Sequence, residues 1–245
     1  MSRAADAAGA GIDRRQFLAL GWFPWLAPRH IGVAGARFRI LRNGRSLRRY
    51  LRIHGNEETA RQVLERHMET HEGIAYVIES RVRLVAVESL KLDPNRMFSR
   101  TGAEANLKLL NPGAPLERVA SAVNVLDRGR EKLVRALTPP KGGVTIELHN
   151  NSAGYSVAAE VPVSDQTSLR QPGVPHAFFL CTDARDFDVL KTSPYNLVLQ
   201  QNGPEDGSLS RLAATRGFRY VNLEVASGEA DRQWEMLTWL EWNLK

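Results

Sequence analysis

The sequence contains one cysteine and no long hydrophobic run. Because Cys181 has no second cysteine among the 245 residues, an intrachain disulfide and a cysteine-based zinc ribbon are both excluded. No apolar stretch reaches the roughly 18 residues that a membrane-spanning helix needs, and neither internal repeats nor low-complexity tracts occur. These absences leave a globular chain whose length fits one domain with a sizeable core.

Basic residues exceed acidic ones, 33 against 27, but the excess lies at one end of the chain. Residues 37–52 contain seven arginines and no acid, whereas residues 53–245 are mildly acidic. A chain-wide preference for nucleic acid is therefore not expected. The arginine-rich segment is interpreted as a solvated first hairpin, and weak contact with an anionic surface is the alternative. We expect a monomer.

Residues 1–36 have the order of an export signal. The pair Arg14-Arg15 precedes an apolar and aromatic segment at 17–28, and the small residues Ala-Gly-Ala at 34–36 form a small-x-small cleavage site, so we expect residues 1–36 to be removed. The run Asp-Arg-Arg-Gln-Phe-Leu at 13–18 resembles the twin-arginine export motif. We therefore predict a periplasmic or extracellular protein with its functional domain at 37–245. A leader on a cytoplasmic protein is the alternative.

From residue 37 onward, short apolar segments alternate with amphipathic ones, which predicts an α/β fold with helices packed on the faces of a sheet. A turn is expected at 43–44, and a loop over one edge of the sheet at 150–175. The predicted strands are 38–41, 50–53, 74–78, 84–87, 144–149, 177–182, 195–200 and 220–225. The predicted helices are 57–71, 116–137, 209–215 and 230–244.

Two segments supply candidate metal ligands. The motif His-Gly-Asn-Glu at 54–57 lies where a predicted strand passes into a helix, so His54 and Glu57 can converge on one ion. His149 ends another strand, and alternation places Glu147 on the same face, where it can hydrogen-bond a ligand. The alternatives are that Glu57 favours the positive end of the helix dipole and that His149 is a strand-edge histidine.

Two more polar groups lie at strand ends, where open α/β sheets place their sites. Glu224 is an acid within an apolar strand, a costly position unless it has a function or a partner such as Arg219. Asn95 and Arg96 combine an amide with a planar guanidinium, which suits bidentate binding of a carboxylate. The alternative is that Asp93 caps the turn and Arg96 pairs with an acid.

Together these residues resemble the zinc carboxypeptidase superfamily, and within it the branch of aspartoacylase and succinylglutamate desuccinylase. The motif at 93–98, Asp-Pro-Asn-Arg-Met-Phe, matches that branch's Asp-x-Asn-Arg-x-Phe, and Glu-Leu-His-Asn at 147–150 matches its acid-Leu-His-Asn. Glu224 follows in the order of the family's catalytic glutamate. The resemblance covers residues 50–225 and implies a single-domain α/β/α sandwich with a mixed, mostly parallel central sheet.

The resemblance also implies a function, a zinc-dependent hydrolase of an amide bond. One zinc ion would be held by His54, Glu57 and His149, with Glu224 as the general base. Asn95 and Arg96 would bind a substrate carboxylate, while Glu147 and Asn150 would support the metal ligands. The expected substrate is a carboxylate-bearing peptide, such as a peptidoglycan stem peptide, or an N-acyl amino acid.

Two features of the family have no clear counterpart in the sequence. The family places an arginine upstream of Asn-Arg to polarise the scissile carbonyl, but residues 85–91 contain none, and Arg83 and Lys91 are the nearby cations. The family's substrate-covering tyrosine is also unassigned, with Tyr155 and Tyr195 as candidates. A different function is therefore also considered, a non-catalytic protein of the same fold that binds a carboxylate or a cell-wall fragment.

Overall fold

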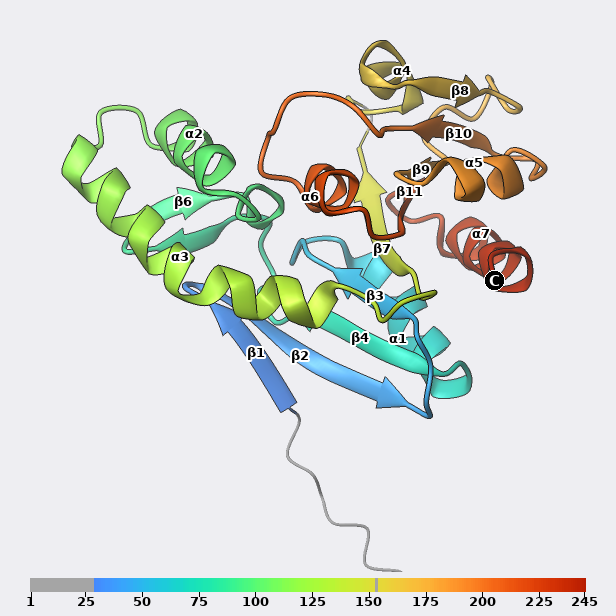
Figure 1. The fold of residues 1–245 in the computed structure, drawn as a ribbon, viewed down its shortest axis with the longest axis horizontal. Helices are drawn as coiled ribbons and strands as arrows, with labels where there is room; N and C mark the ends of the chain where they lie inside the picture. The colour runs from blue at the N-terminus through green and yellow to red at the C-terminus, as the bar shows by residue number, and fades with distance from the viewer. Residues whose placement is uncertain (1–28, 153) are drawn as a thin grey trace, which may run out of the picture.

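A nine-stranded sheet forms the centre of the computed structural model, which describes residues 29–152 and 154–245 (Figure 1). Its strand order is β1-β2-β4-β3-β7-β11-β9-β10-β8. The strands of this sheet are β1 Arg29–Val33, β2 Ala36–Asn43, β3 Arg49–Arg52, β4 Gly73–Ile78, β7 Thr145–Asn151, β8 Gln166–Ser168, β9 Phe178–Cys181, β10 Asn196–Leu199 and β11 Tyr220–Ala226. The strands β4, β3, β7 and β11 are parallel, as are β9 and β10, while the remaining pairs are antiparallel.

Helices cover both faces of the sheet, and a small hairpin of two strands lies beside it. The hairpin consists of β5 Val85–Val87 and β6 Leu90–Leu92. The helices are α1 Glu58–Thr70, α2 Arg100–Leu110, α3 Leu116–Leu137, α4 Val157–Glu160, α5 Ala184–Leu190, α6 Leu209–Arg216 and α7 Ala230–Asn243, with short 3-10 turns at Pro94–Arg96 and Val161–Val163. Within the described ranges, no helix is long and apolar enough to cross a membrane.

Alternation along the strands creates two cores, one on each face. Buried residues of α2, α3 and α6 pack on one face, and those of α1, α5 and α7 on the other. In β7, Ile146 and Leu148 belong to the second core, so Glu147 and His149 point to the opposite face, as their alternation predicts. The predicted single-domain α/β/α sandwich with a mixed sheet is therefore confirmed.

Glu241 on α7 links that helix to the sheet and to α1. Its carboxylate accepts a hydrogen bond from Tyr50 Oη at 2.7 Å and lies 3.1 Å from Arg48 Nε and 3.5 Å from His67 Nε2. Burial alone would raise the pKa of Glu241, but the contacts with His67, Arg48 and Tyr50 outweigh burial and lower it. The last helix is thus attached through an ionised acid.

The structure differs from the prediction in how the first strands pair. The two strands flanking the turn at 43–44 were expected to form a hairpin, but β4 lies between β2 and β3. Helix α1 provides a crossover that places β4 parallel to β3, and β2 then pairs antiparallel with the other side of β4. The predicted strand at 84–87 lies in the separate hairpin, and the predicted loop at 150–175 contains α4 and the edge strand β8.

Helices α2 and α5 were not predicted. Each begins at a side-chain cap, since Ser99 Oγ accepts a hydrogen bond from Gly102 N and Asp183 accepts from Arg185 N. Both helices are short, at 11 and seven residues, and each buries only three residues.

The sheet begins earlier in the chain than residue 37. Strand β1 pairs with β2 from the Arg29–Ile40 pair to the Val33–Ala36 pair, and Val33 and Ala36 are buried. Residues 29–36 therefore belong to the folded domain. The twin-arginine-like motif at 13–18 lies outside the described residues, and export stays a prediction.

Candidate metal centre

The predicted ligands converge where three neighbouring strands of the sheet meet. His54 and Glu57 lie between the end of β3 and the start of α1, and His149 lies on β7, which pairs with β3. On the next strand, β11, Glu224 is the register partner of His149. All four residues line one open cavity of about 510 Å³.

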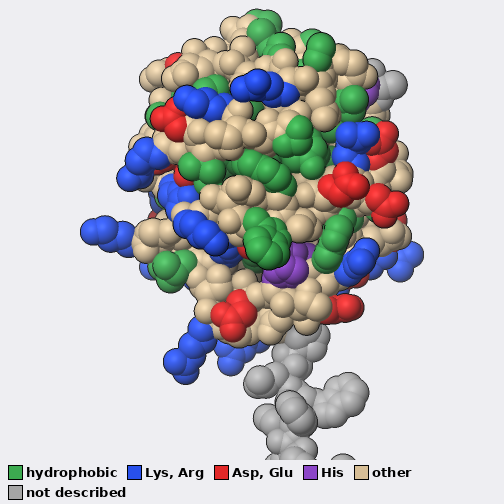
Figure 2. All heavy atoms as spheres, turned by 90° about the vertical axis from the view of Figure 1, so that its right-hand side faces the viewer, with side chains coloured by type: hydrophobic (Ala, Val, Ile, Leu, Met, Phe, Trp, Pro, Cys, Tyr) green, Lys and Arg blue, Asp and Glu red, His purple; other side chains and the backbone are tan. Residues whose placement is uncertain are grey.

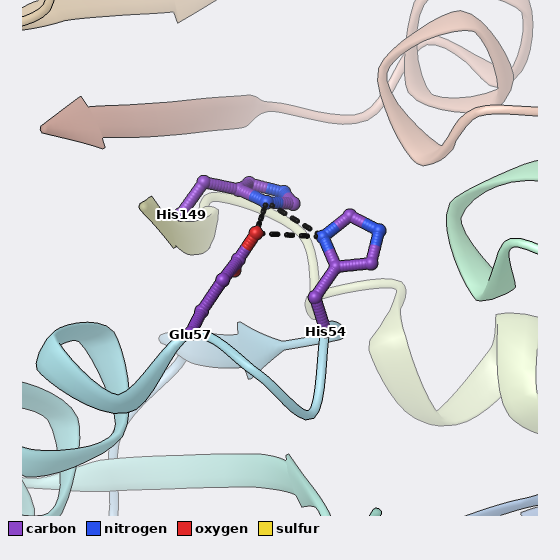
Figure 3. Close-up of side chains that lie close together, drawn as sticks. All are labelled: His54, Glu57 and His149. Atoms are coloured by element: carbon purple, nitrogen blue, oxygen red, sulfur yellow. Dashed lines mark hydrogen bonds and ion pairs between the residues drawn. The ribbon is translucent and has the colours of Figure 1, made fainter. Parts of the chain in front are cut away.

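The ligand atoms of His54, Glu57 and His149 face one another closely (Figure 3). Glu57 Oε1 lies 2.8 Å from His54 Nδ1 and 3.2 Å from His149 Nδ1, and the two Nδ1 atoms are 3.2 Å apart. Donor atoms bound at about 2.0–2.1 Å to one tetrahedral zinc ion lie about 3.3 Å from each other. The observed separations are close to this value, so the three residues fit a zinc ion.

Electrostatics also favour a cation at this point. Burial alone would raise the pKa of Glu57, but the two imidazoles outweigh burial and lower it to about 2. Burial alone would lower the pKa of His149, but Glu57 and Glu147 raise it well above its usual value. Glu57 Oε2 is also buried without a hydrogen-bond partner in the described part of the chain. The cluster therefore requires positive charge at its centre, from bound protons or from a metal ion.

Each of the two histidines has a carboxylate next to its Nε2 atom. His54 Nε2 lies 2.8 Å from Asp93 Oδ1, and His149 Nε2 lies 3.1 Å from Glu147 Oε1. The His149 contact is short but not aligned as a hydrogen bond, and Tyr220 Oη donates to the other Glu147 oxygen. Carboxylates at Nε2 leave Nδ1 as the ligand atom on both rings. Glu147 thus lies beside His149, and its supporting role stays a prediction.

Asp93 was interpreted from the sequence only as a turn cap. In the structure it caps the turn and also contacts His54. Its Oδ1 accepts a hydrogen bond from Asn95 N at 2.9 Å as well as contacting His54. Asp93 therefore couples the turn at 93–96 to the metal ligands. The contact with His54 joins residues 39 positions apart, and no local pattern signals it.

Arg52 holds the loop that carries two of the ligands. It is the last residue of β3, its side chain is 1% exposed, and it donates hydrogen bonds to the backbone oxygens of Glu57 at 3.0 Å, Ile78 at 3.1 Å and Gly55 at 2.5 Å. In the described residues it has no carboxylate partner within ion-pair distance, unlike Arg37, Arg39 and Arg48. The cost of burying this charge is therefore offset by contacts that fix the loop.

Gly55 is required in the same loop because the backbone of residues 80–82 packs against it. A Cβ atom at this position would lie 2.3 Å from Ser80 O and 2.5 Å from Val82 O. The His-Gly-Asn-Glu motif thus combines two ligands with a residue small enough for this close approach.

Glu224 is buried on the cavity wall and is held by two amides. Asn222 Nδ2 donates to Oε1 and Asn151 Nδ2 to Oε2, each at 3.1 Å. Burial raises the pKa of Glu224, and the nearby His149 partly opposes this. The alternative partner, Arg219, instead pairs with Asp186 at 2.8 Å, so Glu224 lacks a cationic partner in the described residues.

Asn95 and Arg96 line the same cavity, and they also structure their own turn. Asn95 Oδ1 accepts a hydrogen bond from Leu209 N at 3.3 Å, and Arg96 Nη1 lies 3.4 Å from Asp206 Oδ2. Arg96 is partly exposed at the cavity mouth. A substrate carboxylate would therefore compete with Asp206 for its guanidinium.

Asn150 acts further from the ligands than the sequence suggested. Its Oδ1 accepts a hydrogen bond from Ala60 N at 2.7 Å, and its Nδ2 donates to His149 O at 3.1 Å. It therefore joins the first turn of α1 to β7 rather than contacting an imidazole. This keeps the helix that follows Glu57 in place beside the strand that carries His149.

The structure distinguishes between the candidates for the two unassigned family features. Arg83 lines the cavity, with Nη1 3.5 Å from Glu57 Oε1 and Nη2 3.2 Å from Asp93 Oδ2, whereas Lys91 lies outside it on β6. Tyr155 lines the cavity, whereas Tyr195 packs against Phe179 in the core of the opposite face. Of these four candidates, Arg83 and Tyr155 are therefore the two that line the cavity.

No protein-family model and no curated protein matches the chain. The solved structures that resemble it include two candidate metallopeptidases. A candidate metallopeptidase from Shewanella baltica OS155 is 12% identical, with 88% of this chain and 85% of that chain covered and a TM-score of 0.49. A second candidate metallopeptidase, from Shewanella amazonensis SB2B, is 13% identical, with coverages of 89% and 86% and a TM-score of 0.46. Likeness at this level does not define an activity, which has to be inferred from the residues of the site.

Proposed function

We propose that the protein is a zinc-dependent hydrolase that cleaves an amide bond in a carboxylate-bearing peptide or N-acyl amino acid. The observation that carries the proposal is the convergence of two imidazole nitrogens and one carboxylate oxygen beside Glu224 in a single open cavity. Three protein ligands bordering accessible space are typical of catalytic rather than structural zinc sites. Zinc held there would supply Lewis acidity, which lowers the pKa of a water molecule and polarises a carbonyl.

Glu224 would act as the general base. Its buried carboxylate is raised in pKa toward the range in which it can both accept and return a proton. It would take a proton from the attacking water and deliver it to the leaving amine. Asn151 and Asn222 would keep both oxygens in a fixed orientation during these transfers.

Arginines would bind the negative parts of the substrate. Arg96, supported by Asn95, would hold a substrate carboxylate in exchange for its contact with Asp206. Arg83 lies beside Glu57 and would stabilise the negative charge that develops on the carbonyl oxygen. These roles suit the cleavage of an amide that lies between an acyl group and a carboxylate-bearing portion.

The experiment combines metal analysis with a hydrolysis screen of the purified full-length protein. Wild type should contain about one zinc per chain, and Glu57→Ala should lose it. Glu224→Gln should keep zinc but fail to hydrolyse any muropeptide or N-acyl amino acid that wild type cleaves, whereas Glu229→Gln, a change of an exposed glutamate, should behave as wild type.

Three results would count against the proposal. A folded wild type that binds no zinc would refute the metal site, and an active Glu224→Gln protein would refute the general base. A zinc-loaded wild type that binds cell-wall fragments and cleaves none would favour the alternative, a non-catalytic binding protein.

We also propose that the protein acts as a monomer outside the cytoplasm and without a nucleic-acid partner. On the face in Figure 2, basic side chains are interspersed with acidic and hydrophobic ones rather than gathered in one patch. Replacing Arg14 and Arg15 with lysine should retain the full-length protein in the cytoplasm if the twin-arginine route is used.

A further inference from the structure

A further carboxylate, Glu160 at the end of α4, lines the same cavity as the candidate metal ligands. One oxygen accepts a hydrogen bond from Tyr155 Oη at 2.6 Å, and the other accepts from Gln200 Nε2 at 2.5 Å. Both donors are neutral, and no lysine, arginine or histidine of the described ranges lies within ion-pair distance of Glu160. The carboxylate is therefore fixed in orientation while its negative charge stays uncompensated.

Its partners stabilise this arrangement. Gln200 is 3% exposed, so its amide has little freedom to turn away. Burial, together with the charges of Glu224 and Glu160, raises the pKa of Tyr155, which keeps the phenol protonated as a donor. A carboxylate offers about four lone-pair sites, so two remain for a ligand.

The strand order places Glu160 and its partners at a distance from the metal ligands. His149 lies on β7 and Gln200 follows β10, and the strands β11 and β9 lie between them. Three strand spacings correspond to about 14 Å across the sheet. The cavity continues over this interval, where Tyr220 and Asn222 of β11 and Leu180 of β9 line it.

The lining of the cavity is poorly suited to an apolar substrate. Among its described lining residues, Leu180 is the only aliphatic side chain. Of the two arginines, Arg96 already faces Asp206 and Arg83 lies at the metal ligands. An extended substrate would therefore meet an anionic group, and not a hydrophobic pocket, at the end marked by Glu160.

We propose that Glu160 binds an ammonium group of the substrate, so that the substrate carries a positive charge several bonds from the scissile amide in addition to its carboxylate. A basic side chain or the free amino group of a neighbouring residue fits this description. The proposal rests on the hydrolase function proposed above and specifies its substrate class. Glu160 would determine specificity without taking part in bond cleavage.

The test compares lysine with norleucine, which has a similar linear side chain without the ammonium group. Zinc-loaded full-length protein is assayed with N-acetyl-lysine against N-acetyl-norleucine, and with N-acetyl-alanyl-lysine against N-acetyl-alanyl-norleucine. We expect wild type to favour the lysine member by about tenfold in kcat/KM, and Glu160→Gln to abolish this preference while cleaving the norleucine member at the wild-type rate. Glu104→Gln, a change of an exposed glutamate on α2, should keep the preference.

A binding measurement separates this proposal from the proposed function. Calorimetric titration of Glu224→Gln, which is expected not to cleave, with N-acetyl-lysine and N-acetyl-norleucine should show the same preference, and combining this change with Glu160→Gln should remove it. Hydrolysis without a lysine preference would overturn the role of Glu160 and leave the hydrolase function standing. Preferential lysine binding without any hydrolysis would support the Glu160 site and count against the enzyme. Equal binding of N-acetyl-lysine and N-acetyl-norleucine by Glu224→Gln would refute the site.

Discussion

Replacing Arg52 should weaken metal binding although Arg52 is not a metal ligand. Its guanidinium bridges the backbone oxygens of Gly55 and Glu57 in the ligand loop to that of Ile78 in β4. Lysine keeps the charge but carries it on a single nitrogen that cannot reach three oxygens in this planar arrangement. Arg52→Lys therefore releases the loop while preserving most of the side-chain volume.

The expected magnitude follows from the hydrogen bonds that are lost. A hydrogen bond from a charged donor contributes roughly 1.5–3 kcal/mol, so losing two of the three should reduce the free energy of unfolding by about 3 kcal/mol or more. Removing a group that orients metal ligands typically costs about 10- to 100-fold in metal affinity. We expect a zinc Kd raised by that factor in Arg52→Lys.

The assay is competition for zinc between the protein and a chelating indicator, together with thermal unfolding of the metal-free protein. Arg49→Lys is the matched control, since Arg49 lies on the same strand but donates only to Ser46 O and Arg48 O. It should bind zinc as wild type does. An Arg52→Lys protein that folds and binds zinc with wild-type affinity would show that the loop does not depend on Arg52.

Three further outcomes can be measured on the same protein. Gly55→Ala should weaken zinc binding because the new Cβ would clash with Ser80 O. Gly173→Ala is the control and should bind zinc as wild type does, because position 173 has open space around it. Equal zinc affinities of the two variants would contradict this prediction. Glu241→Gln should lower Tm at neutral pH. Because the pKa of Glu241 is lowered in the folded state, the ionised carboxylate stabilises the fold above about pH 4.3, and this contribution is lost as the pH falls further. A Tm difference between wild type and Glu241→Gln that stays unchanged at about pH 3 would refute this expectation. A chelator should lower the Tm of wild type but not of Glu57→Ala, and an equal effect on both would place the metal elsewhere.

The convergence of the candidate metal ligands could be predicted from the sequence because local rules help to determine their placement. His54 and Glu57 flank one strand-to-helix turn, and the alternation of β7 puts His149 and Glu147 on the same face. Glu224 could be recognised because an acid interrupts an apolar strand. For His149, Glu147 and Glu224, the alternation of the strand fixes the direction of the side chain.

The residues that support this site could not be predicted in the same way. Arg52 lies among seven arginines, and composition does not reveal which charge is buried. Glu160 lies in a segment without periodicity, and its partner Gln200 is 40 residues away. The positions of β2 and β4 depend on a crossover through α1, which the hydrophobic pattern of each strand does not specify.

Strand β1 limits how the N-terminal segment can be processed. It covers the outer edge of β2, and the turn joining them packs so tightly on the β5–β6 hairpin that a Cβ at Gly35 would lie 1.8 Å from Ala86 O. Cleavage after Ala36 would remove β1 and leave the backbone N–H and C=O groups along one side of β2 without partners. Such an edge can pair with the same edge of a second molecule and promote aggregation. A mature form that retains the intact sheet must therefore begin no later than Arg29.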